Sequence, residues 1–281
     1  MDSLVFAAVL LAAAAHAGWN AAIKRGLDPL VTTVLIAVGA GAVALPIAVW
    51  VGLPAAAAWP WVIASVIVHL GYFAGLIEAY RAGDMSQVYP IARGAAPLLT
   101  ALVSTAWLGE RLGLLGWGGL LCLVGGVMML SLRGGGDLTR LDRRAVGFAL
   151  FTALTVCAYT VIDGVGVRAS GNALAYTAAV FFGNAVIMAL YGLARRGHKL
   201  LAGLSQLWRT GLGGGALQFA SYGIALWAMT IVPIAVVAAL RETSVLFGAL
   251  IAVVVLREPL RPLRVAAAVL IVAGLVMIKT H

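Results

Sequence analysis

Long apolar runs fill almost the whole chain, and short breaks rich in Gly, Pro and charged residues separate them. Each run is close to the roughly 20 residues that a helix needs to cross a bilayer. Backbone in lipid must satisfy its own hydrogen bonds, and barrel strands would be about 10 residues long with alternating polarity, so we interpret the runs as helices. The sequence therefore predicts an all-α integral membrane protein with ten transmembrane helices, at residues 3–23, 31–52, 60–81, 86–108, 113–132, 145–167, 172–194, 210–230, 233–256 and 263–279.

Composition narrows the protein class further. Of the 281 residues, 63% are hydrophobic and 10% are charged, whereas soluble domains carry about a quarter charged residues. This excludes a soluble enzyme, a disulfide scaffold, a disordered chain and a coiled coil. Cys122 and Cys157 lie inside apolar runs without metal-like spacing, so we expect them to be packing residues. Because Met1–Ser3 lack a basic residue, we expect the first run to span the membrane rather than to be a cleaved signal peptide.

The two halves of the chain resemble each other at an offset of 148 residues. The matched pairs include Arg93 with Arg241, Glu110 with Glu258, Gly126 with Gly274 and Met129 with Met277. Five helices in each copy is an odd number, so the second copy must enter the membrane inverted, as in secondary transporters with a binding site near the midplane. We predict two inverted five-helix repeats, with a first repeat at 1–132, a linker at 133–144 and a second repeat at 145–281.

The net charge of +9 comes from basic residues in alternate loops rather than from a basic face for nucleic acid. The other set of loops and the tail hold only Arg111, Arg168 and Lys279. The positive-inside rule then predicts a multi-pass protein of the bacterial inner membrane with both termini outside the cytoplasm. The basic set is Lys24, Arg25, Arg81, Arg133, Arg140, Arg143, Arg144, Arg195, Arg196, Lys199, Arg209, Arg257, Arg261 and Arg264.

Several motifs resemble those of the drug/metabolite transporter superfamily, EamA type. They are the segment LGERL at Leu108–Leu112 with its repeat LREPL at Leu256–Leu260, the glycine-containing last spans at Leu121–Leu130 and Leu270–Ile278, and HAGWNAAIK at His16–Lys24. The resemblance covers the whole chain. It implies alternating access by two bundles around a central cavity, and export or exchange of amino acids, amines, nucleotide sugars or drugs. The start of HAGWNAAIK is also similar to family members encoded beside phosphonate-utilisation genes. The family more usually keeps both termini cytoplasmic, whereas the charges here predict the reverse.

Two arginines inside predicted helices are the first candidate site residues. A charge at a helix centre costs roughly 2.5–3.5 kcal/mol on insertion scales, so such residues usually face a cavity or a partner. Arg93 shares one helix face with Tyr89, and a guanidinium is suited to binding carboxylate, phosphate or phosphonate. The alternative is a structural ion pair of Arg93 or Arg241 with a carboxylate. The candidate partners are Glu78, Asp163 and Glu242.

Other polar residues inside the runs extend the candidate site. His16, Trp19 and Asn20 lie together on the first helix, where they either line the cavity or bond between helices, while Lys24 is expected to reach the interface. Glu78, Asp163 and Glu242 are coupling or structural carboxylates, and Glu110 and Glu258 are expected to cap helices. Further aromatic candidates for an organic substrate are His69, Tyr72, Tyr159 and Tyr222.

These observations predict a secondary active transporter that moves a small polar organic metabolite, such as an amino acid, an amine or a phosphonate-like compound, by alternating access. A flippase for lipids or lipid-linked metabolites is an alternative. An integral-membrane enzyme fits less well, because no HExxH-like metal motif or clustered nucleophile is present. We expect no enzymatic activity, cofactor, metal or nucleic acid. The expected partners are the substrate, the bilayer and protons as a candidate coupling ion, and we expect a monomer or weak dimer.

Overall fold

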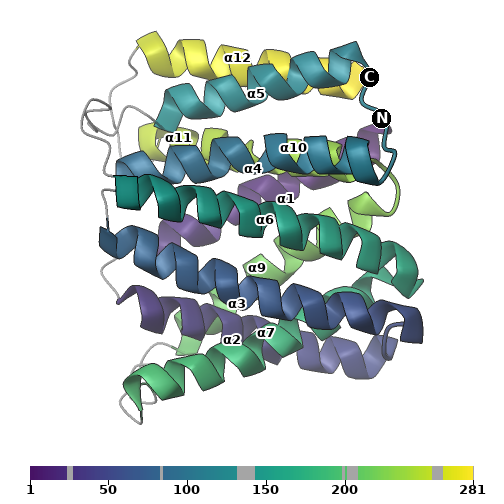
Figure 1. The fold of residues 1–281 in the computed structure, drawn as a ribbon, viewed down its shortest axis with the longest axis vertical. Coiled ribbons are helices and arrows are strands. Elements are labelled where there is room, and N and C mark those ends of the chain that lie inside the picture. Colours follow the sequence, from purple (N-terminus) through teal and green to yellow (C-terminus); the bar gives the residue numbers. More distant parts are fainter. Residues whose placement is uncertain are drawn as a thin grey trace.

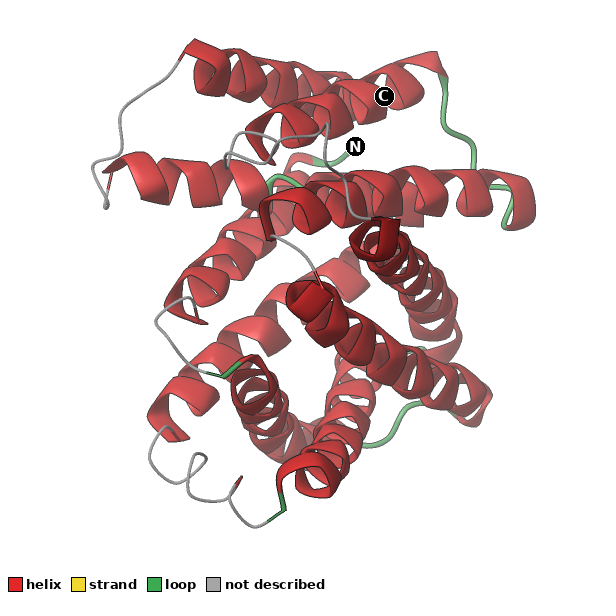
Figure 2. Cartoon of the chain, turned by 60° about the vertical axis from the view of Figure 1, so that its left-hand side comes forward, coloured by secondary structure: helices red, strands yellow, loops and turns green. Residues whose placement is uncertain are grey.

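The computed structural model describes residues 1–23, 28–82, 85–131, 143–197, 200, 208–254 and 262–280. Within these ranges every regular element is a helix and there is no strand (Figure 1, Figure 2). The elements are α1 Ser3–Ile23, α2 Pro29–Val51, the short 3₁₀-helix η1 Ala56–Ala58, α3 Trp59–Ala82, α4 Met85–Trp107, α5 Leu114–Ser131, α6 Arg143–Ser170, α7 Ala173–Arg196, α9 Trp208–Met229, α10 Ile234–Arg241, α11 Ser244–Val254 and α12 Pro262–Thr280.

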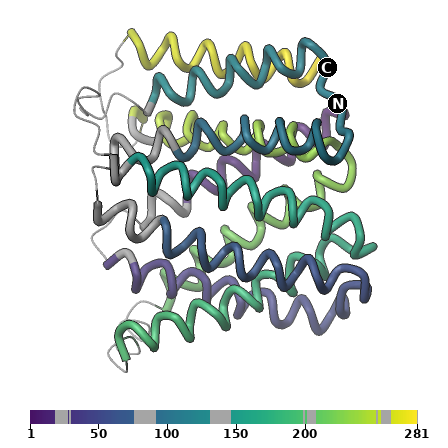
Figure 3. Tube along the Cα trace, viewed as in Figure 1, coloured from purple at the N-terminus to yellow at the C-terminus, as the bar shows by residue number. Residues whose placement is uncertain are grey.

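Five described helices are long and apolar enough to cross a membrane by length and composition alone, within the segments 30–51, 56–75, 146–170, 173–196 and 262–280. Large apolar side chains such as Leu11, Val49 and Val276 are more than half exposed on the outside of the bundle, as lipid contact requires. The two termini lie at the same end of the molecule (Figure 1, Figure 3), where the Met1 amino group donates to the Lys279 carbonyl at 3.3 Å. The chain therefore crosses the bundle an even number of times.

Local side-chain chemistry sets several helix ends. Asp28 caps α2, because its carboxylate accepts from the backbone N–H groups of Leu30 and Val31 at 2.9 and 3.3 Å. Asn172 caps α7 in the same way. The preceding Gly171 has a φ of +69°, so the chain reverses between α6 and α7 within two residues.

Helices α5 and α12 cross with two-fold symmetry. A Cβ on Gly119 would lie 2.8 Å from the Gly274 carbonyl oxygen, and a Cβ on Gly126 would lie 2.8 Å from the Ala267 carbonyl oxygen. At the offset of 148 residues, Gly119 corresponds to Ala267 and Gly126 to Gly274, so each contact is the symmetry mate of the other. The early part of one helix meets the late part of the other, so the helices are antiparallel. Two inverted copies require this geometry.

Other helix contacts also occur in pairs, in which each helix of one copy is replaced by its equivalent in the other copy. Helix α2 packs on α7, and α4 packs on α10. The contact of α3 with α6 is mirrored by that of α9 with α1, and the contact of α4 with α6 by that of α11 with α1. These pairings place α1 and α6 next to the arginine-bearing helices. The repeat relation read from the sequence therefore extends to the arrangement of the helices.

The prediction of one continuous helix over 233–256 is wrong, because the structure divides this stretch into α10 and α11. Between them, Glu242 N–H donates to the Ala239 carbonyl at 3.0 Å and Thr243 N–H donates to the Leu240 carbonyl at 3.1 Å. These i→i−3 bonds are of the 3₁₀ type and tighten the turn. The Thr243 hydroxyl also donates to the Leu240 carbonyl, at 2.7 Å, and such side-chain bonding competes with the regular helix. The break follows directly after Arg241.

Candidate substrate-binding site

Arg93 lies on α4 and contacts the break between α10 and α11. Its Nη2 donates to the Ser244 hydroxyl at 2.8 Å, and its Nε lies 3.0 Å from a Glu242 carboxylate oxygen. The Glu242 side chain is 6% exposed and that of Arg93 is 18% exposed. The sequence left two interpretations open for Arg93, binding of an anionic substrate or a structural ion pair. The structure shows an ion pair with Glu242. The arginine of the first copy therefore holds the broken helix of the second.

Arg241 lies in the last turn of α10, directly before the break, and has a different environment. Its guanidinium carbon lies 4.7 Å from the centre of the Tyr222 ring, which is a cation–π contact. Among the described residues, no carboxylate lies within ion-pair distance of Arg241. Its side chain is partly exposed although its helix neighbours from Ile234 to Leu240 are buried. This arginine is therefore the described cation that can accept an anionic ligand at the centre of the bundle.

Asp163 on α6 is fully buried and accepts hydrogen bonds from two tyrosines. Tyr222 donates its hydroxyl to one carboxylate oxygen at 2.5 Å, and Tyr176 donates to the other at 2.9 Å. Tyr222 therefore contacts Asp163 through its hydroxyl and Arg241 through its ring face. The sequence allowed an ion pair of Asp163 with Arg93 or Arg241. In the structure Asp163 forms an ion pair with neither arginine.

An aromatic cluster adjoins these charged residues. The His69 ring stacks on Tyr159 with centroids 4.2 Å apart, and Tyr72 and Tyr222 meet Tyr159 edge-on at 5.6 and 6.2 Å. His69 is held in place by its Nδ1, which lies 2.9 Å from the Ser65 carbonyl oxygen. Tyr72 keeps partial exposure while Tyr159 and Tyr222 are buried. The structure thus brings together four residues that the sequence placed in the site, from three different helices.

His16 on α1 completes the described part of the site. It is partly exposed and interacts electrostatically with both Arg93 and Arg241. The side chains of Trp19, Asn20, Glu78 and Tyr89, and the whole of Lys24, lie outside the described part of the chain. Their assignments remain predictions.

Three residues of this cluster were not singled out from the sequence: Ser65, Tyr176 and Ser244. Ser65 precedes His69 by one helical turn, and Ser244 follows Arg241 by three residues. Small hydroxyl side chains are common at helix–helix contacts in membranes, so the residue types alone carried little information. The contact of Tyr176 with Asp163 depends on the close approach of α6 and α7, which the sequence does not specify.

A second charged cluster lies at the end of the molecule that holds the termini. The Glu110 carboxylate accepts from the Arg168 guanidinium at 2.8 Å and from the Ile234 backbone N–H at 3.0 Å. Ile234 is the first residue of α10. Glu110 therefore caps a helix of the opposite repeat rather than the helix that follows it in sequence, α5. Glu258, its repeat partner, lies outside the described residues.

Comparison with known proteins gives the fold and the family. A solved structure titled "Crystal structure of protein" is similar, with a TM-score of 0.79 at 20% sequence identity over 99% of both chains. At this identity the likeness concerns the fold alone. No curated protein matches the sequence. The EamA-like transporter family matches residues 3–132 and 143–280, which correspond to the two halves of the chain. The protein is therefore a multi-pass membrane protein that belongs to the EamA-like transporter family.

Proposed function

We propose that the protein is a secondary carrier for a small organic molecule with an anionic group, such as an amino acid or a phosphonate-like compound. It moves this substrate across the bacterial inner membrane by alternating access, without ATP. The observation that carries the proposal is Arg241, which lies at a helix break in the centre of the bundle with no carboxylate at ion-pair distance among the described residues.

Charge balance supports Arg241 as the group that binds the anion. A cation within the bilayer is costly unless it has a partner, and among the described residues Arg241 has no carboxylate at ion-pair distance and lies over the Tyr222 ring. Its planar fork of N–H donors matches a carboxylate or phosphonate group and remains charged at any working pH. An anion at this position would replace a weak cation–π contact by charge-assisted hydrogen bonds.

The neighbouring side chains fit an organic molecule better than a bare inorganic anion. His16, which interacts with both arginines, retains exposure, and so does Tyr72, which meets Tyr159 in the aromatic cluster with His69. Binding sites for small molecules commonly combine aromatic walls with a few polar groups that fix orientation. The stacked rings would contact the carbon skeleton or a cationic amino group of the substrate, while Arg241 holds its anionic end.

The symmetry of the fold supports alternating access. Inverted repeats can exchange conformations, and broken helices at the repeat interface are typical of substrate sites in such carriers. The break at Glu242–Thr243 lies where α10 and α11 of the second copy meet α4 of the first. Orientation follows from the charge distribution, which places both termini outside the cytoplasm. A reporter fused to His281 that is active only in the periplasm would test this assignment.

The experiment on function begins with a thermal-shift screen of amino acids, amines, phosphonates and nucleosides on purified protein. A stabilising compound is then tested for counterflow in liposomes that contain the wild type, Arg241→Lys or Arg241→Gln. We expect wild-type exchange without ATP, partial loss in Arg241→Lys and loss of about 10- to 100-fold in Arg241→Gln, because a charged hydrogen bond contributes about 1.5–3 kcal/mol. An ATP requirement, or full activity in Arg241→Gln, contradicts the proposal.

A matched control for this experiment is Arg195→Gln. Arg195 also lies over a tyrosine ring, with its guanidinium carbon 5.9 Å from the centre of Tyr191, but it is exposed at the end of α7. Removal of its charge should leave counterflow unchanged. A loss equal to that of Arg241→Gln would show that the assay responds to total charge rather than to the central site.

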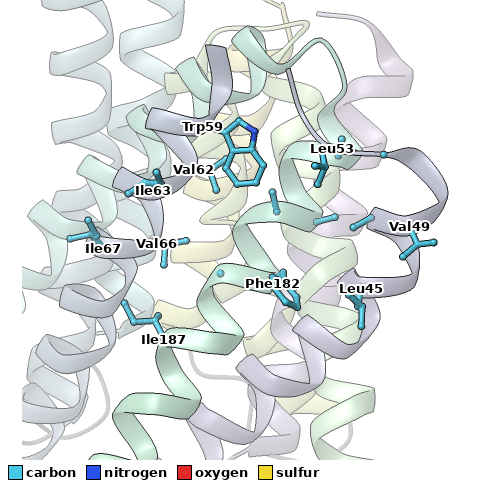
Figure 4. A pocket seen from close by; sticks show the side chains of 16 residues that line it. Leu45, Val49, Leu53, Trp59, Val62, Ile63, Val66, Ile67, Phe182 and Ile187 are labelled. Atoms are coloured by element: carbon cyan, nitrogen blue, oxygen red, sulfur yellow. The ribbon is translucent and has the colours of Figure 1, made fainter. Parts of the chain in front are cut away.

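A lateral apolar groove favours a second candidate function, the movement of lipids. The groove has a volume of about 750 Å³ between α2, α3 and α7 and is lined by apolar side chains such as Leu45, Val49, Ile67 and Phe182 (Figure 4). It fits a lipid acyl chain. However, a Cβ on Gly183 would lie 2.7 Å from Val66, so α3 and α7 are in close contact at the floor of the groove. Neither Arg93 nor Arg241 lines the groove, and this favours the small-substrate carrier. Transfer of a fluorescent phospholipid between leaflets would support the lipid function instead.

A further inference from the structure

Asp163 has a position that substrate recognition by Arg241 does not explain. Its side chain is fully buried inside the bundle, and both carboxylate oxygens accept tyrosine hydroxyls. Among the described residues, no Arg or Lys lies within ion-pair distance of it. An isolated buried carboxylate is costly, and hydrogen bonds offset only part of the cost. Asp163 is therefore a group for which gain or loss of a proton changes the energy of the bundle substantially.

Tyr222 connects this carboxyl to the proposed anion site. Its hydroxyl donates to Asp163 at 2.5 Å, and the Arg241 guanidinium carbon lies 4.7 Å from the centre of its ring. The Asp163 carboxylate thus contacts the hydroxyl of Tyr222, and the Arg241 guanidinium contacts the ring face of the same tyrosine. In a medium of low dielectric constant, each of these charges stabilises the other across the ring.

Other helices packed against α6 also bring titratable groups toward Asp163. Helix α3 contributes His69, which packs on Tyr159 of α6 itself. Helix α4 contributes Arg93, which is bound to Glu242, and η1 contains only alanines. The described titratable groups that interact with Asp163 are therefore His69 of α3, Tyr159 of α6, Tyr176 of α7 and Tyr222 of α9, while Arg93 of α4 and Arg241 of α10 interact with Tyr159.

Glu242 is the other buried carboxylate of the described site, and its charge is already balanced. It forms an ion pair with Arg93 at 3.0 Å, so its protonation would leave that arginine without a counter-charge. Among the described residues Asp163 has no Arg or Lys at ion-pair distance, and the base that interacts with it is His69. Of the carboxylates predicted as coupling candidates, Asp163 is therefore better placed than Glu242 to bind a proton.

We propose that Asp163 binds a proton together with an anionic substrate at Arg241, and that Tyr222 couples the two events. The inference rests on the proposed function. When an anion binds, it neutralises Arg241 and so weakens the positive field that reaches Asp163 through Tyr222. A proton from water on the open side then adds to one Asp163 oxygen, and it returns to water when the anion leaves. The step forms the carboxyl O–H bond, breaks one O–H bond of a hydronium ion and leaves a water molecule. By linkage, the protonated carboxyl strengthens anion binding by the same factor.

The test does not require the natural substrate. Infrared difference spectra of purified protein are recorded over a pH titration, because the C=O stretch of a protonated carboxyl is separate from the carboxylate bands. Asp163→Asn assigns the band, and Glu242→Gln is the matched control that should retain it. Arg241→Gln imitates neutralisation by an anion, and Arg241→Lys keeps the charge. Methanesulfonate serves as an anionic probe whose own charge is constant over the titration.

We expect the Asp163 band to titrate in the wild type. Arg241→Gln should move its midpoint to higher pH by about one unit or more, as expected for the loss of a nearby opposite charge, and Arg241→Lys should move it little. Tyr222→Phe keeps the ring but removes the hydroxyl donor, so it should also move the midpoint upward. Methanesulfonate should move the wild-type midpoint in the direction of Arg241→Gln and should have no effect on Arg241→Gln itself.

Two results would overturn the proposal: a band that survives Asp163→Asn, or a midpoint that is the same in Arg241→Gln and the wild type. If Asp163→Asn does not fold, the contrast between Arg241→Gln and Arg241→Lys still decides. Methanesulfonate that stabilises the wild type thermally but leaves the midpoint unchanged also contradicts the coupling. If counterflow does not depend on Arg241 but the titration midpoint of Asp163 does, the proposed function is contradicted. The titration of Asp163 is then still established.

Discussion

Arg93 and Arg241 hold the same position in the two copies of the repeat, yet their surroundings differ. Arg93 lies on the continuous helix α4 and is bound by Glu242 and Ser244. Arg241 ends a short helix and lies over Tyr222 without a carboxylate partner among the described residues. The repeat therefore brings two arginines to one region of the bundle but provides a counter-charge for only one of them.

The difference originates in the residues that follow each arginine. In the second copy Glu242, Thr243 and Ser244 follow, and they form the break and supply the partners of Arg93. At the equivalent positions the first copy has Gly94, Ala95 and Ala96, which have no polar side chain to offer Arg241. A Cβ on Gly94 would lie 2.6 Å from the Met128 sulfur, so a side chain here would displace Met128. The copies are thus related in fold but differ at the arginine, which is ion-paired in the first copy and is the proposed ligand-binding group in the second.

The largest expected effect on stability comes from Arg93→Gln. The change leaves Glu242 buried with an uncompensated charge, which should lower the free energy of unfolding by about 3 kcal/mol or more. The double variant Arg93→Gln/Glu242→Gln should recover most of the loss, because it removes both charges. Thermal unfolding in detergent measures both. A double variant no more stable than Arg93→Gln would show that the ion pair is not what fixes the break, and would weaken the contrast with Arg241.

Much of the fold could be predicted because it depends on apolar periodicity and chain symmetry. The run predicted at 31–52 is α2 at Pro29–Val51, and the run at 172–194 is α7 at Ala173–Arg196. The break after Arg241 could not be predicted in this way. It lies at the polar residues Arg241–Ser244 inside a longer apolar run, and the 3₁₀ bonds around Glu242 and Thr243 that end α10 are not specified by hydropathy.

The site was predicted in its residue types and less well in its pairings. Charged and aromatic residues inside helices are rare enough to be noticed, and the pair Arg93–Glu242 was among the alternatives. Which carboxylate meets which arginine depends on the rotation of each helix about its axis, which the sequence does not specify. The contacts of Tyr222 with both Arg241 and Asp163, and of Ser244 with Arg93, therefore appear only in the structure.

An intermediate effect is expected at the crossing where the copies are most alike. Gly126→Ala and Gly274→Ala each place a Cβ within 2.8 Å of a carbonyl oxygen of the opposite helix, so α5 and α12 must separate. Each should destabilise the protein by about 1–3 kcal/mol, and by similar amounts, because the positions are symmetry mates. Gly248→Ala is the control, since nothing lies within 4 Å of its Cβ and it should be neutral or slightly stabilising. Strongly unequal losses in thermal unfolding would contradict the two-fold relation of the crossing.

The smallest expected effect is that of Ser244→Ala, which removes one acceptor of Arg93 and leaves its ion pair with Glu242 intact. Because Arg93 is 18% exposed, water can replace part of the lost bond, and the free energy of unfolding should fall by only about 1 kcal/mol. Ser104→Ala is the matched control on α4, since the buried Ser104 hydroxyl has no hydrogen-bond partner among the described residues. It should cost nothing. If Ser244→Ala costs as much as Arg93→Gln, then the hydroxyl rather than the carboxylate anchors Arg93, and the two arginines differ by a hydrogen bond and not by a counter-charge.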